Sequence, residues 1–275
     1  MAGAHHGVAP EKWAIGPPAP KAFAYLARLL MLLLVVTVGH WIRVHLGGVA
    51  IMPVSTGPDA NDTGALFNWH PLLMVLGFGV FMAEALMSYQ APLMPWLTRQ
   101  GRKTVHWVLH SLALLCIALG LLAAYKSHSL KLPVPIPNWY SPHSFLGLTT
   151  MALLAVQFVV AAFAYLYPGA SLAFRLALGP LHKFSGKAVW VMGLAAIATG
   201  LQEKTSFLQM GKGLKGDQLY SGIVRLPAVA MVLLALLGLV VLYHQVPPAA
   251  PAPLPEDGGD KSERHGLLAA NGMDA

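Results

Sequence analysis

Six long apolar stretches, separated by short polar segments, set the pattern of this 275-residue chain. Each is 20 to 25 residues long, and about 20 apolar residues in a helix are enough to cross the roughly 30 Å hydrocarbon core of a bilayer. Apolar side chains fall on all faces of these predicted helices, which is typical of a membrane span. The stretches are approximately Ala22–Leu46, Asn68–Tyr89, His106–Tyr125, His143–Tyr167, His182–Leu201 and Ile223–Tyr243.

Long, continuous stretches of this kind favour helices over a membrane barrel, whose strands are short and alternate in polarity. The sequence therefore predicts an all-α membrane protein with six transmembrane helices and no sheet. No short apolar segment precedes a cleavage site, so no signal peptide is expected. We expect a polar N-terminal tail at 1–21, a six-helix domain at 22–244, and a proline-rich, disordered C-terminal tail at 245–275.

Composition agrees with this class and excludes others. Hydrophobic residues make up 56% of the chain and charged residues only 11%, whereas soluble domains carry roughly a quarter charged residues. The net charge is +7, but the basic residues are spread between apolar stretches, so membrane topology explains them better than nucleic-acid binding. The single cysteine, Cys116, lies in an apolar stretch, which leaves no disulfide framework and no cysteine metal site.

The distribution of lysine and arginine predicts the orientation. An even number of spans places both termini on one side of the membrane. Nine basic residues lie on that side, in the tails and in the loops after the second and fourth spans, against five in the other loops. Because positive charge concentrates in cytosolic segments, both termini are predicted to face the cytosol.

Four histidines begin four consecutive spans: His70, His106, His143 and His182. Successive helices enter from alternating sides, so His70 and His143 share one membrane face and His106 and His182 share the other. A buried imidazole in lipid is costly without a partner. The alternative is that each histidine only caps its helix or lies at the interface, but four at matched depths favour two paired sites.

The chemistry of such a pair points to haem. Two histidines without a carboxylate or thiolate make a poor zinc site. They make a good axial pair for a porphyrin iron, which then has no open position and carries electrons. Glycines one turn after two of the histidines, Gly147 and Gly186, and Gly77 and Gly79 on the second span, either leave space for a flat macrocycle or serve helix packing.

Several motifs on different spans occur together in the order of a known family. The segments Phe67–Leu72, Lys103–His110, Tyr140–Phe145, Tyr167–Ala170 and Leu181–Gly186 resemble the cytochrome b561 family. The resemblance covers the six spans, about Ala22 to Tyr243. The chain departs from the commonest motif at Pro142 and at Phe145, where tryptophan is usual, and its third loop is proline-rich.

The resemblance implies a transmembrane ascorbate-dependent oxidoreductase. It implies that electrons pass from cytosolic ascorbate through two haem b groups to monodehydroascorbate or a ferric chelate on the other side. A central four-helix bundle is expected to hold the haems. The axial ligands it implies are His70 with His143 for the outer haem and His106 with His182 for the cytosolic haem, the same pairs that topology gives.

The resemblance also implies substrate residues. Cytosolic ascorbate is expected at Lys103, Arg175 and Arg99, which are otherwise ordinary positive-inside residues. The outer substrate is expected at His128 and Asn138, otherwise a solvated loop histidine and a turn asparagine. A homodimer in an endomembrane, such as a vacuole or vesicle, or in the plasma membrane follows from the family, whereas the residues do not identify the membrane.

Two residues and two other functions stay open. Glu84 lies inside the second span and either tunes a haem, takes a proton or pairs with a cation; His110, one turn after His106, is an alternative ligand. A histidine-lined metal or proton transporter would need polar residues or broken helices at mid-membrane, where these spans are apolar. A haem-anchoring subunit of a larger complex is the remaining alternative.

Overall fold

The computed structural model describes residues 20–166 and 170–245 of the chain. Six of its helical segments are long and apolar enough to cross a membrane, which confirms the predicted number of spans. The predicted tails lie almost entirely outside the described residues. The six segments are Ala22–His45, Gly64–Met87, Arg99–Ser129, Pro142–Leu166, Leu172–Gly211 and Gly216–Tyr243.

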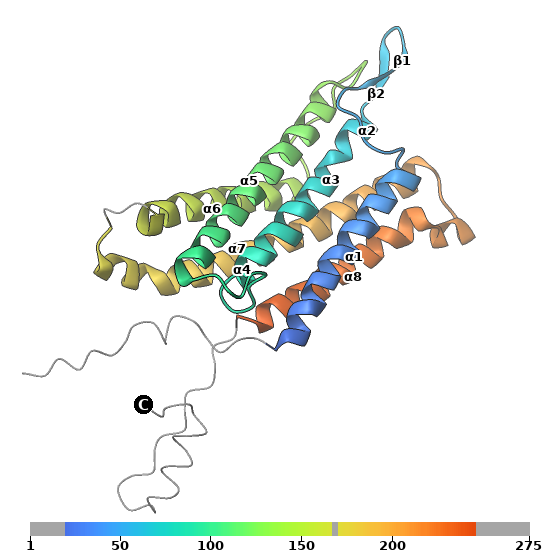
Figure 1. Ribbon diagram of the computed structural model, residues 1–275. Coiled ribbons are helices and arrows are strands. Elements are labelled where there is room, and N and C mark those ends of the chain that lie inside the picture. The colour runs from blue at the N-terminus through green and yellow to red at the C-terminus, as the bar shows by residue number, and fades with distance from the viewer. Residues whose placement is uncertain (1–19, 167–169, 246–275) are drawn as a thin grey trace, which may run out of the picture. The chain divides into compact units, whose positions relative to one another are not determined.

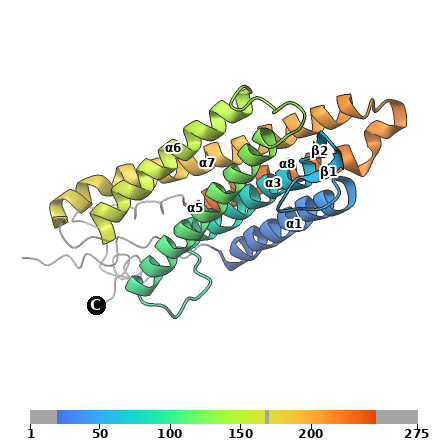
Figure 2. The same cartoon turned by 90° about the horizontal axis from the view of Figure 1, so that it is seen from above.

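The helices pack in an antiparallel arrangement around the second span (Figures 1 and 2). Helix α1 packs chiefly on α8, α5 packs on the second span, and α6 packs on α7. The elements in chain order are α1 (Lys21–His45), β1 (Val54–Gly57), β2 (Ala60–Asp62), α2 (Gly64–Phe67), α3 (Trp69–Met74), η1 (Val75–Met82), α4 (Ala83–Met87), α5 (Arg99–Ser129), α6 (Pro142–Ala161), η2 (Ala162–Leu166), α7 (Leu172–Gly211), η3 (Gly216–Tyr220) and α8 (Gly222–Tyr243).

Helices α1 and α8 brace the second span from one side. The Trp41 indole donates to the carbonyl of Ile223 at 3.0 Å, which joins the end of α1 to the start of α8. At the other end, the rings of Phe23 and Tyr243 lie 5.0 Å apart between centroids. The first and last described helices therefore begin and end at the same end of the bundle, which is called the basic end here because α5 and α7 also begin there with their arginines.

The second span is not one regular α-helix. Its middle, η1, forms wide π-helical turns over eight residues, and such turns often occur near functional sites. The Trp190 indole on α7 donates to the carbonyl of Phe78 in η1 at 2.9 Å. The Phe78 ring lies where a Cβ at Gly193 would be only 2.2 Å away. Glycine at 193 is therefore what allows α7 to approach the second span.

Two helices are longer than predicted. Helix α5 has 31 residues and α7 has 40, so the sequence prediction that placed Arg99, Lys103 and Arg175 in loops, and His128 in an outer loop, was wrong. The hydroxyl of Thr98 accepts from the Gly101 amide, and that of Ser171 caps α7 in the same way. Caps of this kind start a helix in polar sequence, so the apolar stretch alone underestimates helix length.

The expectation of no sheet also needs a small correction. Strands β1 and β2 form an antiparallel hairpin, with Val54 opposite Asp62 and Ser55 opposite Asn61. Both strands lie outside the spans, where water satisfies their free edges. The Asn61 side chain donates to the carbonyl of Leu130 at 2.8 Å and so fixes the hairpin against the end of α5. The opposite end of the bundle is called the β1–β2 end here.

An ion pair between Arg28 and the buried Glu84 explains the acidic residue inside the second span. The Arg28 guanidinium on α1 donates from Nε to Glu84 at 2.8 Å and from a terminal nitrogen to the same carboxylate at 3.1 Å. It also donates to the carbonyl of Ala91 at 2.8 Å. Glu84 therefore pairs with a cation, and breaking such a pair leaves a buried charge uncompensated.

Candidate functional site

The four span-starting histidines lie in two pairs, one toward each end of the bundle. The ring centroids of His70 and His143 are 6.0 Å apart, and those of His106 and His182 are 6.4 Å apart. The ring planes within each pair are close to perpendicular, at 77° and 69°. Each pair takes one histidine from the second span or α5 and one from α6 or α7.

The separation within each pair fits two imidazoles that share one metal ion. A metal–imidazole bond is about 2 Å long, so two coaxial rings bound through nitrogen have centroids about 6.3 Å apart. Within residues 20–166 and 170–245, no three His, Cys, Asp or Glu side chains gather into a metal site. Each pair therefore offers two protein ligands, which suits an iron whose other four ligands belong to a porphyrin.

Hydrogen bonds orient three of the four rings through backbone carbonyls. The Nδ1 atom of His70 lies 3.0 Å from the Gly120 carbonyl, and that of His143 lies 3.0 Å from the Ala196 carbonyl. The Nδ1 atom of His106 lies 2.8 Å from the Ala85 carbonyl. Because a carbonyl only accepts, each Nδ1 must carry the proton. Nε2 is then free to bind a metal, and the carbonyl raises its basicity.

The fourth ring has a different partner. The Nδ1 atom of His182 lies 2.8 Å from the Gln157 side-chain nitrogen. The same nitrogen donates to the His182 carbonyl at 2.9 Å, and the Ser185 hydroxyl donates to the Gln157 oxygen at 2.8 Å. Sequence reasoning missed Gln157, because a single glutamine in an apolar helix matches no ligand pattern.

The glycines divide between the two interpretations that the sequence left open. A Cβ at Gly77 would lie 2.8 Å from Ile117, so this glycine serves helix packing. A Cβ at Gly147 would meet nothing within 4 Å, which leaves open space one turn after His143. The strongest constraint falls on Gly200, where a Cβ would be 2.6 Å from the His143 ring.

At the β1–β2 end, an aromatic ring joins a candidate substrate residue to a histidine pair. The Phe67 ring lies 5.5 Å from that of His70 and stacks on that of His128 at 6.3 Å, with the planes 6° apart. The Lys204 ammonium lies 4.6 Å from the Phe67 centroid. Asn138 lies in the neighbouring loop and donates to the Ser129 hydroxyl at 3.5 Å. Lys204 escaped the sequence analysis because the helical extension of α7 that positions it was not predicted.

At the basic end, the candidate cations lie on the same helices as His106 and His182, shortly before these histidines. Lys103 lies one turn before His106, and Arg175 lies two turns before His182. Within the described part of the chain, the side chains of Lys103, Arg175 and Arg99 make no hydrogen bond or ion pair, so these cations are available to an anion. The Tyr165 hydroxyl donates to the backbone carbonyl of Arg175 at 3.1 Å.

Two tyrosines lie against the same histidine pair. The Tyr89 ring is 5.6 Å from that of His106, and the Tyr165 ring is 5.3 Å from that of His182. Burial raises the pKa of the Tyr89 phenol, and nearby Arg99 partly offsets this. Tyr89 therefore keeps its proton at neutral pH and can donate a hydrogen bond.

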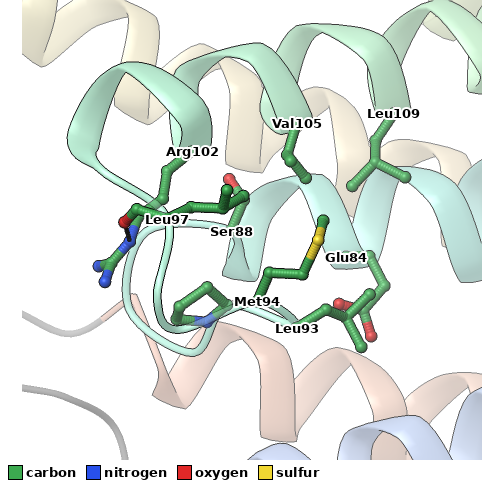
Figure 3. A pocket seen from close by; sticks show the side chains of 9 residues that line it. Glu84, Ser88, Leu93, Met94, Leu97, Arg102, Val105 and Leu109 are labelled. Carbon is green, nitrogen blue, oxygen red and sulfur yellow. Dashed lines mark hydrogen bonds between the residues drawn. The ribbon is translucent and has the colours of Figure 1, made fainter.

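A small pocket beside these residues is not suited to an anion (Figure 3). Leu93, Met94 and other apolar side chains face Val105 and Leu109 across it. Its polar side chains are already engaged: Glu84 pairs with Arg28, the Ser88 hydroxyl bonds to the Ala85 carbonyl at 2.7 Å, and Arg102 donates to three backbone carbonyls. Arg102 therefore holds the loop before α5.

His110 lies closer to His106 than His182 does. Its ring centroid is 4.6 Å from that of His106, and the two planes meet at 74°. This distance is shorter than the roughly 6.3 Å that two coaxial imidazoles on one metal require. The geometry therefore favours His182 over His110 as the partner of His106.

Comparison with known proteins identifies the family of the chain. A family model described as eukaryotic cytochrome b561 matches residues 69–208, which include all four histidines. A probable ascorbate-specific transmembrane electron transporter 2 from Oryza sativa subsp. japonica is 33% identical over 227 residues, covering 82% of this chain and 89% of the relative. Transmembrane ascorbate ferrireductase 1 from Arabidopsis thaliana is 32% identical, covering 69% of this chain and 74% of the relative.

An animal relative is equally similar. A lysosomal membrane ascorbate-dependent ferrireductase from Bos taurus is 33% identical over 216 residues, covering 74% of this chain and 72% of the relative. The six spans, the histidine pairs within the matched region and these relatives agree with one another. The chain belongs to the cytochrome b561 family, whose members bind haem.

Proposed function

We propose that this protein carries electrons across a membrane from ascorbate, through two b-type haems, to monodehydroascorbate or a ferric chelate. The observation that carries the proposal is the pair of matched histidine sites, with ring centroids 6.0 and 6.4 Å apart, at opposite ends of a six-helix bundle. The relatives named as ascorbate-specific transporters and ferrireductases support the donor and the ferric acceptor.

Haem bound at each pair supplies reversible one-electron chemistry. The chain's contribution is to hold His70 with His143 at one end and His106 with His182 at the other. Two histidines bound to one haem iron would leave it no free position for oxygen. Along α7, His182 and Ala196, whose carbonyl holds His143, are fourteen residues or about 21 Å apart. One helix therefore positions ligands for both levels of the membrane.

The donor site is proposed at the basic end, where Lys103, Arg175 and Arg99 meet the helices of the His106–His182 pair. Ascorbate is an anion at neutral pH, and cations that donate hydrogen bonds hold it more strongly than neutral groups. The excess of basic residues on this side of the chain supports a cytosolic location for this end and for both termini. A protease added to the cytosolic side of sealed vesicles should then digest a tag fused after Ala275; protection of the tag would reverse the orientation.

The acceptor site is proposed at the β1–β2 end, at His128 and Asn138. The stack of His128 on Phe67, and of Phe67 against His70, connects this site to the His70–His143 pair. Lys204 adds a positive charge over the same ring, which favours an anionic acceptor such as monodehydroascorbate or ferric citrate.

The test is haem content and reduction of the purified protein. The expected result is two haems per chain by pyridine haemochrome assay, with a low-spin visible spectrum that ascorbate reduces without any other protein. One haem or none per chain would overturn the dihaem proposal. Failure of ascorbate to reduce a fully loaded protein would favour a haem-anchoring subunit of a larger complex.

A further inference from the structure

Gln157 on α6 contacts the Nδ1 atom of His182, whereas backbone carbonyls contact Nδ1 of the other three paired histidines. His106 bonds to the carbonyl of Ala85, which lies fifteen residues after His70, whereas His182 bonds to Gln157, which lies fourteen residues after His143. Both partners lie on the helix that supplies a ligand of the other pair. In the proposed His106–His182 haem site, His106 is therefore held by the main chain and His182 by a side chain.

The side-chain partner differs chemically from a carbonyl. A carboxamide offers an accepting oxygen and a donating nitrogen at similar positions, so both of its orientations fit the same space. In the structure, the nitrogen faces His182 Nδ1 and the oxygen accepts from Ser185. A hydroxyl can donate or accept, so Ser185 can bond to either end of the amide.

Metal binding distinguishes the two orientations. For His182 to bind iron through Nε2, Nδ1 must keep its proton and needs an acceptor. Turning the Gln157 amide presents its oxygen to Nδ1 and its nitrogen to Ser185, but gives up the bond to the His182 carbonyl at 2.9 Å. The other three rings need no such rearrangement, because their partners are carbonyls.

We propose that Gln157 is a positioning residue for the His106–His182 haem. Its carboxamide oxygen accepts a hydrogen bond from the Nδ1–H group of His182 and so sets the electron-donor strength of that ligand. This inference rests on the proposed haem site. A stronger acceptor at Nδ1 makes the imidazole more electron-rich, stabilises ferric iron and lowers the reduction potential. A side chain that replaces a carbonyl at this position makes the potential of this haem adjustable by a single substitution.

The experiment is a redox titration of the purified holoprotein with two opposed variants. Gln157→Leu removes the acceptor and should raise the potential of the His106–His182 haem, whereas Gln157→Glu supplies a stronger acceptor and should lower it. The potential of the other haem should stay unchanged in both variants. The g-values of the low-spin ferric signal should move in opposite directions in the two variants, because they depend on axial-ligand strength.

Two further variants separate this role from a general packing effect. Ser185→Ala removes the hydroxyl that holds the carboxamide and should give a smaller upward shift than Gln157→Leu. Ser111→Ala is the matched control, because the Ser111 hydroxyl on α5 donates to the Trp107 carbonyl of the same helix at 2.9 Å, which orients none of the four histidines. It should leave both potentials unchanged.

The outcomes distinguish this inference from the proposed function. Wild-type protein without two haems would defeat the proposed function, and this inference with it. Two haems with unchanged potentials in Gln157→Leu and Gln157→Glu would overturn the positioning role alone. Shifts of the same sign in both variants would also overturn it, because disturbed packing does not depend on acceptor strength.

Discussion

Two helix pairs build the site, and they differ in how they hold it. The first helix pair consists of the second span and α5; the second consists of α6–η2 and α7. In the first, Gly120 lies fourteen residues after His106 and its carbonyl holds His70. In the second, Ala196 lies fourteen residues after His182 and its carbonyl holds His143. The two pairs thus repeat one scheme, with a side-chain partner at Gln157 and a spacing of fifteen residues between His70 and Ala85 as its departures.

Their surroundings differ more than their ligands. In the first helix pair, the second span packs against α1 and is largely buried through η1 and α4, whereas α8 packs chiefly on α1 and on α7 of the second pair. In the second pair, every residue of α6 except Thr150 and Leu154 is exposed or half-buried. Ligand geometry is therefore similar in two unequal settings, which indicates that local hydrogen bonds, and not the depth of the core, orient the rings.

Removal of a ligand should have the largest effect. Which haem is lost should depend on the histidine pair, and not on the helix pair, to which the residue belongs. His106→Ala and His182→Ala are on different helix pairs, yet both should lose the same haem and leave one haem per chain. His70→Ala and His143→Ala should lose the other. Haem content and the visible spectrum measure this; loss patterns that follow the helix pairs would contradict it.

Removal of a donor-site cation should have the next largest effect. Lys103→Ala on the first helix pair and Arg175→Ala on the second should each weaken reduction by ascorbate, because each loses a charge-assisted hydrogen bond worth about 1.5–3 kcal/mol. That corresponds to roughly ten- to hundredfold in apparent affinity.

Rapid mixing with ascorbate over a range of concentrations measures the donor-site effect, and the haem spectra serve as the control. His128→Ala should leave this half-reaction intact and slow reoxidation by the acceptor. Wild-type rates in both cation variants at every ascorbate concentration would show that the donor binds elsewhere.

A methyl group added at Gly200 or at Gly120 should affect the two helix pairs unequally. Gly200→Ala places Cβ 2.6 Å from the His143 ring, whereas Gly120→Ala places it 3.1 Å from the flexible end of Met74. Overpacking costs about 1–3 kcal/mol, so Gly200→Ala should destabilise the protein and disturb the spectrum of the His70–His143 haem. Thermal unfolding should show a smaller loss for Gly120→Ala; equal losses would mean that the His143 ring moves aside without cost.

The smallest effect is expected at the bond that joins the two helix pairs. Trp190→Phe removes the hydrogen bond to the Phe78 carbonyl and keeps most of the ring. The loss should be about 0.5–1.5 kcal/mol in the free energy of unfolding, with both haems retained. Chemical unfolding in detergent measures it, and loss of a haem in this variant would instead assign Trp190 a role in the site.

The sequence predicted the two histidine pairs better than the groups that orient them, for a physical reason. His70, His106, His143 and His182 are visible because imidazole is rare in apolar stretches. The carbonyls that hold three of them carry no sequence signal, since every residue has one. Helices α5 and α7 also continue past the C-terminal ends of their apolar stretches into polar residues, so Lys204 and the helical position of His128 were missed.

Helices α5 and α7 each extend past both histidine levels and carry at each level either a ligand or the carbonyl that orients one. In the proposed dihaem arrangement, a stiff helix that reaches both histidine levels would limit how far the ligands move when an electron arrives. Small nuclear displacement means low reorganisation energy, which keeps the barrier to each electron step low even when the driving force is slight. Helices α5 and α7 thus make the spacing of the two histidine pairs a fixed property of the helices, insensitive to bending of the surrounding lipid.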